Sequence, residues 1–89
     1  MVHAFITFDT IDADGFAKAV AQGARALEGA KGYHGLQLLR GVEDPARFIL
    51  MADWDSVDDH MVWMEVNGTA FLAMLMPSLT GKPQIRHFT

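Results

Sequence analysis

Residues 32–63 read GYHGLQLLRGVEDPARFILMADWDSVDDHMVW, and this stretch decides the fold that the sequence predicts. Two apolar segments, residues 33–41 and 47–54, have the length and the residue types of strands, and a short Asp-Pro turn separates them. Ser56 then predicts the start of a helix that carries His60 and Trp63. The stretch therefore predicts a β-hairpin followed directly by a helix.

The rest of the chain extends this pattern on both sides. Alternating apolar residues predict a strand over residues 2–8, and an apolar stripe at helical spacing predicts a helix over residues 14–29. The helix that begins at Ser56 is expected to break at Asn67-Gly68 and to resume over residues 69–76, before a last strand over residues 83–88. The order β-α-β-β-α-β predicts a ferredoxin-like α+β fold, with one four-stranded antiparallel sheet in the order 4-1-3-2.

The strand predicted over residues 47–54 is apolar on both of its faces. A half-solvated antiparallel strand alternates apolar and polar residues, so a strand that does not alternate is covered on both sides. The helices of the same chain would supply one cover, and a second copy of the chain would supply the other. Hydrophobic residues make up 51% of only 89 residues, which also favours a homodimer built from single domains spanning residues 1–89.

Composition excludes several classes of protein. The net charge of −4, with scattered Lys and Arg, argues against nucleic acid or an anionic membrane as a partner. No apolar run is long enough to cross a membrane, and the first residues lack the features of a signal peptide, so a cytoplasmic location is expected. The chain has no cysteine and therefore no disulfide or thiolate metal site.

Three stretches resemble the antibiotic-biosynthesis monooxygenase (ABM) family of small dimeric α/β barrels. They are Gly32–Arg40, Phe48–Ser56, and the pair His60 and Trp63. Together they give the pattern Gly-aromatic-x-Gly, apolar strand, short turn, apolar strand, Trp-x-Ser. The resemblance extends over nearly the whole chain, and it implies a sheet whose open face pairs with the sheet of a second subunit.

The same resemblance implies several activities. The family includes cofactor-free oxygenases of polycyclic phenols and quinols, haem-degrading enzymes, and proteins without an assigned role. The haem-degrading branch uses an Asn in the first strand, a Trp on the second helix and an axial His. Trp63 matches the Trp, but His3 or Ala4 stands at the Asn position and Met74 stands near the axial position. Haem degradation therefore departs from the pattern of that branch.

The predicted strand order brings several polar residues to one end of the sheet. In an antiparallel sheet of order 4-1-3-2, this end holds His3, His34, Asp53, Trp54 and His87. One interpretation is a proton-transfer group in which Asp53 orients a histidine base. A metal site is a second interpretation, and solvated histidines at the rim of the sheet are a third.

The second helix offers another candidate site. His60 and Trp63 lie at positions i and i+3, with Met64 at i+4, so their side chains are neighbours on the helix. They could form a pocket wall with an aromatic plate and an imidazole base, or Trp63 could belong to the core while His60 lies at the surface. Arg86, on the last strand, could stabilise a substrate anion or form a structural ion pair.

The leading prediction is a cofactor-independent monooxygenase that uses O₂ to oxidise a polycyclic aromatic phenol, anthrone or quinol in antibiotic biosynthesis. The alternatives are a haem-binding or haem-degrading protein and a non-oxidative dimeric barrel, either a small-molecule-binding protein or a cyclase. No cofactor and no metal are expected in the leading interpretation. The predicted catalytic residues are His60, Trp63 and Arg86, and the predicted pocket residues are His3, His34, Trp54, Met64 and Met74.

Overall fold

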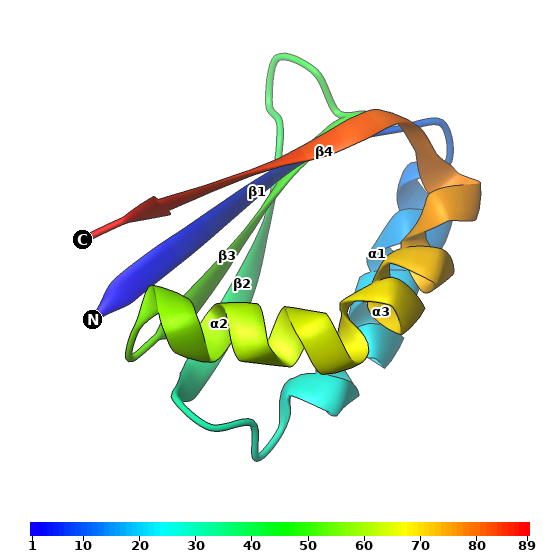
Figure 1. Cartoon of the computed structure of the whole chain (residues 1–89). Coiled ribbons are helices and arrows are strands. Elements are labelled where there is room, and N and C mark those ends of the chain that lie inside the picture. The colour runs from blue at the N-terminus through cyan, green and yellow to red at the C-terminus, as the bar shows by residue number, and fades with distance from the viewer.

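The computed structural model describes residues 1–89 and has the predicted ferredoxin-like order of elements (Figure 1). The four strands form one antiparallel sheet in the order β2-β3-β1-β4, which confirms the predicted fold class and strand order. The elements are β1 (Val2–Thr10), α1 (Ala13–Gly23), η1 (Ala24–Leu27), β2 (Tyr33–Arg40), β3 (Arg47–Trp54), α2 (Val57–Trp63), η2 (Met64–Gly68), α3 (Thr69–Leu75), η3 (Met76–Ser78) and β4 (Leu79–Phe88).

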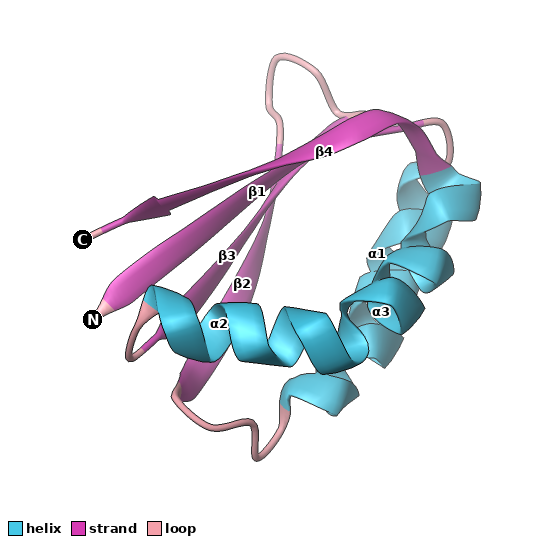
Figure 2. Cartoon of the chain, in the orientation of Figure 1, coloured by secondary structure: helices cyan, strands magenta, loops and turns pink.

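The helices cover only one face of the sheet (Figure 2). Alternate residues of the central strands point toward the helices, so Ile6 and Phe8 of β1 and Leu50 of β3 are buried against Phe16 and Val20 of α1. A second core cluster lies near the other end of the sheet and contains Ala4, Leu27, Ala52, Trp54 and Trp63. No helix of the structure is long and apolar enough to span a membrane.

Two helices begin with side-chain caps. The Asp12 carboxylate accepts a hydrogen bond from the Gly15 backbone N–H at 3.0 Å, and Ser56 Oγ accepts one from the Asp59 N–H at 3.1 Å. Such caps pair backbone donors that the first turn of a helix leaves free. The Ser56 cap fixes where α2 starts, and it therefore helps to position His60 one turn later.

The predicted helix break at Asn67-Gly68 is wrong. Both residues lie in η2, a π-helical turn that leads directly into α3. Gly68 has helical dihedral angles and is buried, while the Asn67 side chain donates to the Trp63 carbonyl at 3.4 Å. The helix continues because the turn widens to take an extra residue and because burial favours it, overriding the local signal for a break.

Other boundaries also differ from the predictions. The first helix changes after Gly23 into a 3₁₀ turn that ends at Leu27. β4 begins at Leu79 rather than at Pro83, because its first residues pair with β1 across a register shift between Thr7 and Asp9. Because of this register shift, a β-bulge, the pairing of β4 with β1 extends over more residues than the alternation of apolar residues alone indicates.

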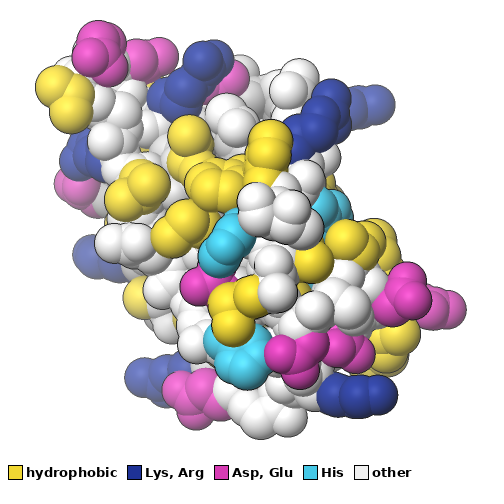
Figure 3. Space-filling view, turned by 90° about the vertical axis from the view of Figure 1, so that its left-hand side faces the viewer, with side chains coloured by type: hydrophobic (Ala, Val, Ile, Leu, Met, Phe, Trp, Pro, Cys, Tyr) yellow, Lys and Arg dark blue, Asp and Glu magenta, His cyan; other side chains and the backbone are white.

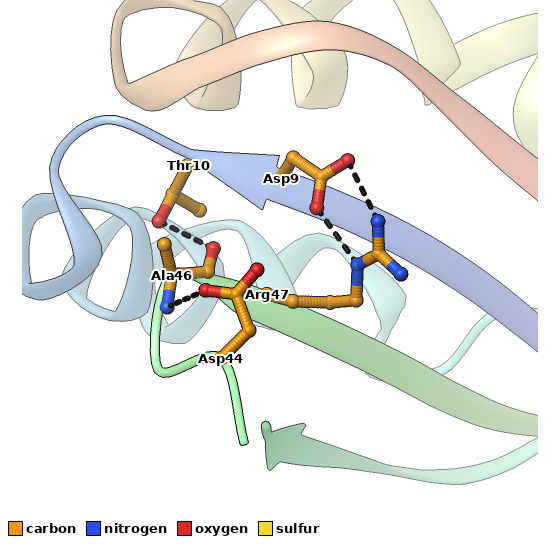
Figure 4. A network of polar contacts seen from close by, with 5 residues as sticks. All are labelled: Asp9, Thr10, Asp44, Ala46 and Arg47. Carbon is orange, nitrogen blue, oxygen red and sulfur yellow. Dashed lines mark hydrogen bonds and ion pairs between the residues drawn. The ribbon is translucent and has the colours of Figure 1, made fainter. Parts of the chain in front are cut away.

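A polar network holds the end of the sheet that lies away from the chain termini (Figure 4). The Thr10 hydroxyl donates to the Ala46 carbonyl at 2.7 Å, and the Asp44 carboxylate accepts from the Ala46 N–H at 3.1 Å. Arg47 Nε donates to the Asp9 carboxylate at 2.8 Å, and this hydrogen bond lowers the pKa of Asp9. The contacts fix the β2–β3 turn against β1.

Candidate functional site

Two histidines meet in the layer between the sheet and α2. His60 of α2 is only 2% exposed, and its Nδ1 lies 2.8 Å from Nε2 of His87 on β4. One ring must donate a proton in this contact and the other must accept it. His87 is half-buried. The pair therefore joins one ring that is shielded from water to one that water reaches.

Aromatic rings enclose His60. Its ring stacks on Trp54 with centroids 5.0 Å apart and an angle of 20° between the planes. Tyr33 and Trp63 lie on other sides of Trp54, with ring centroids 5.4 and 6.3 Å away from it. The Trp54 indole N–H is buried without a hydrogen-bond partner, which costs about 1–3 kcal/mol. This donor remains available to a buried water or to a polar ligand atom.

Burial controls the charge of His60. Loss of solvation disfavours the imidazolium, and repulsion by His87 adds to the effect, so that the pKa of His60 falls from 6.5 to about 4. The His60 ring is therefore neutral at pH 7. A neutral ring in contact with a second imidazole can accept a proton on one side and pass one on from the other.

An apolar cavity of about 150 Å³ lies between β1 and β4 on one side and η2 and α3 on the other. Seven of its nine lining residues are hydrophobic. Ile6, Phe8 and Ile85 form the main walls on the sheet, and Met64, Phe71 and Leu75 form those on the helices. The volume is close to that of an engineered protein cavity that binds benzene.

The cavity and the histidine pair belong to the same layer of the molecule. Met64 follows His60 by one helical turn, and its backbone N–H donates to the His60 carbonyl. Ile85 precedes His87 by two residues, so both side chains lie on the helix-covered face of β4. Met64 and Ile85 thus line the cavity at positions one helical turn from His60 and two residues from His87.

The sequence predicted that several residues at the ends of the strands lie together. In the structure they are distributed over the two faces of the sheet. His3 pairs with Asp53 on the open face, with His3 Nδ1 2.5 Å from the carboxylate. His34 contacts Asp55 at the rim and is 44% exposed. His87 lies on the opposite face with His60, so Asp53 does not orient the buried pair.

The other predicted site residues have different surroundings. Trp63 is 6% exposed, and its indole N–H donates to the Ala26 carbonyl at 3.1 Å, which places it in the core beside Phe71. Arg86 lies on the open face and donates to the Ile85 carbonyl without an ion pair. Met74 is 41% exposed and lines none of the cavities.

The open face carries a broad groove of about 560 Å³ at its β1–β4 side. Phe5 and Phe88 meet edge to face in it, with ring centroids 5.3 Å apart. Figure 3 views the side of the molecule on which both termini lie and shows apolar side chains bordered by charged ones, with histidines among them. The polar side chains that line the groove are His3, Thr7, Gln84, Arg86 and Thr89.

Sequence reasoning missed the role of His87 as the partner of His60. The signal was the spacing of Ile85 and His87, two residues apart, which places both on one face of the last strand. In the predicted topology this face lies against the helices. Sequence reasoning also missed Phe71 and Leu75 as cavity walls, because the expected break at Asn67-Gly68 left the orientation of α3 undefined. No group of three His, Asp or Glu side chains is placed to hold a metal ion.

A family profile and several solved structures are similar to this chain. The sequence profile described as "Antibiotic biosynthesis monooxygenase" matches residues 1–73. A Bordetella bronchiseptica protein bearing that family name has a TM-score of 0.92 and 26% identity, over 99% of this chain and 94% of its own. No curated protein matches the sequence.

Two more distant structures show the same fold. SnoaB of Streptomyces nogalater, a cofactor-independent oxygenase, has a TM-score of 0.86 and 19% identity, over 99% of this chain and 90% of its own. A Caulobacter crescentus protein bearing the family name has a TM-score of 0.83 and 17% identity, over 98% of this chain and 86% of its own.

Proposed function

The chain belongs to the antibiotic biosynthesis monooxygenase family, and from that premise we propose that it is a cofactor-independent monooxygenase. Its substrate would be a polycyclic aromatic phenol, anthrone or quinol, and its oxidant O₂. The observation that carries this proposal is the buried, neutral His60 in contact with His87, in the same layer as an apolar cavity. A family relative of similar fold, SnoaB, is a cofactor-independent oxygenase.

The chemistry needs a base and a dry, apolar surrounding. Removal of one proton turns an anthrone into a carbanion, which can give electrons to O₂ directly. Overall, a ring CH₂ group and O₂ become a ring carbonyl and water, so the substrate supplies the electrons. Apolar walls such as Phe71 and Ile85 would hold the planar anion and keep bulk water away.

The histidine pair compensates for the low basicity of His60. With a pKa of about 4, an isolated His60 would be a weak base at neutral pH. When Nδ1 carries the proton, Nε2 can accept one from the substrate while the Nδ1 proton moves to His87 Nε2, 2.8 Å away. The positive charge then resides on the more exposed ring, where water stabilises it.

Oxygen uptake by the purified protein tests this proposal. The protein is mixed in air with a panel of anthrones and naphthohydroquinones, with chelator present and without added flavin, haem or metal. We expect protein-dependent uptake, reduced about 10²- to 10⁴-fold in both His60→Gln and His87→Gln. Glu43→Gln, in the exposed β2–β3 turn, is the control and should retain full activity. Full activity in both histidine variants would contradict the proposed base.

A non-oxidative reaction is the second candidate, because a proton-transfer pair beside an apolar cavity equally suits a cyclase or isomerase. Loss of substrate without uptake of O₂ in the same assay would favour it. Haem does not fit the residues of the cavity, because no histidine lines it to serve as an axial ligand. An absent Soret shift on adding haem is the corresponding expectation.

We also infer that the protein is a homodimer joined through the open face of the sheet. A single chain buries only 17 of its 89 residues, and the open face exposes apolar side chains that a second copy could cover. These side chains come from all four strands, namely Phe5, Leu39, Ile49, Met51 and Phe88.

A further inference from the structure

Met64 occupies a special position in the layer between sheet and helices. It is the first residue of the π-helical turn η2, it lines the apolar cavity, and it also packs against the core cluster that contains Trp54 and Trp63. Its side chain, like that of Phe71, therefore lies between the cavity and the aromatic cluster that contains Trp54, on which His60 stacks.

The thioether lies over a glycine. A methyl group added at Gly68 would come within 3.1 Å of Met64 Cε and 3.5 Å of Met64 Sδ. Gly68 itself lines the cavity and is buried. The absence of a side chain at this position leaves the space that the methionine now fills, and π-helical turns of this kind occur often at functional sites.

Three of the other cavity walls are stiffer than Met64. Ile6 and Ile85 are β-branched and sit in paired strands, and Leu75 is fully buried in the first core cluster. Methionine is unbranched, with three rotatable bonds, and adapts to irregular spaces. Among these four side chains, Met64 is therefore the one that can move at the lowest cost in free energy.

The volume makes such movement necessary for a large ligand. The cavity holds about 150 Å³, enough for a single aromatic ring, whereas ligand pockets commonly span about 300–1,000 Å³. A fused ring system fits only if a wall retreats. Met64 and Phe71 both line the cavity and pack against the cluster that contains Trp54, and Met64 is the more adaptable of the two because it is unbranched, with three rotatable side-chain bonds. Ile85 is β-branched and stiff.

We propose that Met64 is a movable wall whose displacement joins the apolar cavity to the His60–His87 pair and sets the size of the ring system that the site admits. The inference rests on the proposed function, to which it adds the residue that selects for substrate size. In this arrangement a single ring binds beside Met64, while a tricyclic ligand takes the space that the thioether leaves.

Binding of two non-substrate probes tests the proposal. The probes are phenol, with one ring, and alizarin, a tricyclic hydroxyquinone that is already oxidised, and quenching of Trp54 and Trp63 fluorescence reports binding. We expect Met64→Ala to bind alizarin about tenfold more tightly than the unmodified protein, equivalent to about 1.4 kcal/mol. Phenol affinity should change much less. Met64→Leu, stiffer but of similar volume, should bind alizarin more weakly than the unmodified protein.

Met76→Ala is the matched control, because Met76 is 54% exposed and lines none of the cavities. It should leave both affinities unchanged. Equal changes for the two probes in Met64→Ala, or no binding of either probe to any variant, would overturn the proposal. Circular dichroism establishes that each variant is folded. The two probes report binding alone. Size selection by Met64 together with no oxygen uptake across the panel of anthrones and naphthohydroquinones would therefore contradict the proposed oxygenase while leaving the role of Met64 intact.

Discussion

His60 is the residue whose protonation state matters most to both stability and chemistry. Its ring is buried against Trp54, and its pKa in the folded protein is about 4, below the ordinary value of 6.5. Between these two values the unfolded chain binds a proton that the folded chain does not bind. Stability therefore falls as the pH drops from 6.5 toward 4, and this contribution is absent above pH 6.5.

We predict that His60→Gln flattens this part of the pH dependence. In the unmodified protein, His60 should lower the free energy of unfolding by about 2 kcal/mol when the pH falls from 7 to 5. Each unit of difference between the unfolded and folded pKa values corresponds to about 1.4 kcal/mol. Urea unfolding at the two pH values measures this quantity in both proteins. A change of this buried side chain is expected to lower stability at both pH values, so the readout is the difference in the free energy of unfolding between the two pH values. An unchanged pH dependence in the variant would show that His60 is not shielded from protons.

Local sequence patterns predicted part of this site at the level of residues. The spacing of His60 and Trp63 correctly indicated neighbours on one helix, yet it did not reveal that Trp63 turns its N–H to the Ala26 carbonyl. The partner of the His60 ring is His87, 27 positions away in the chain. No short-range pattern encodes such a contact, which only the alignment of β4 against α2 creates.

At the level of elements, the loop before β2 and the helix after β3 are fitted to each other. Gly32 has a φ of +81°, and a methyl group at this position would clash with the Asp59 carboxylate in the first turn of α2. The Gly32 carbonyl also accepts a hydrogen bond from the Asp55 N–H at 2.7 Å. The loop thus sets where α2 begins and, through it, where His60 lies.

Gly32→Ala should therefore destabilise the protein more than Gly29→Ala. Both glycines have positive φ, where a side chain costs about 1–2 kcal/mol, but nothing lies within 4 Å of a methyl group at Gly29. The additional loss of stability in Gly32→Ala, compared with Gly29→Ala, measures the clash with Asp59. Thermal or urea unfolding measures both variants, and the double variant Gly32→Ala/Asp59→Ala should recover part of this additional loss. Equal losses in the two single variants would refute the proposed fit.

The second helix shows where element-level reasoning fails. Asn67-Gly68 is a strong local signal for a break, and yet the chain remains helical through it. The Asn67 amide bonds to the Trp63 carbonyl, and the space above Gly68 is filled by Met64. Burial and side-chain hydrogen bonding outweigh the cost of glycine in a helix, which is only about 1 kcal/mol. The two strands of the hairpin, by contrast, followed their local pattern closely.

For the whole molecule, the sheet divides the candidate groups between its two faces. The helix-covered face holds the histidine pair and the apolar cavity, while the open face holds His3, Asp53 and Arg86. The apolar residues on both faces of β3 predicted that the helices of the chain cover one face and a second copy covers the other, and the helices do cover one face only. The sequence could not assign each histidine to a face without the register of β1 and β4.

Met51→Lys should convert a dimer into a monomer. Met51 pairs with Phe5 and Gln37 in the middle row of the open face, so a lysine there would place an unpaired charge in the centre of the interface. In a single chain the same lysine reaches water, so the fold itself should survive. Light scattering should give a mass near 9.8 kDa for the variant and twice that for the unmodified protein.

Val62→Lys on α2 is the control, because Val62 is 61% exposed and its change should leave the dimer intact. A dimer that persists in Met51→Lys would place the interface elsewhere. The histidine pair lies on the opposite face of the sheet, so a folded monomer should keep the lowered His60 pKa and its pH-dependent stability. If dissociation also abolished that pH dependence, the second copy would be needed to hold α2 and β4 together, and the buried pair would be a property of the assembly rather than of the chain.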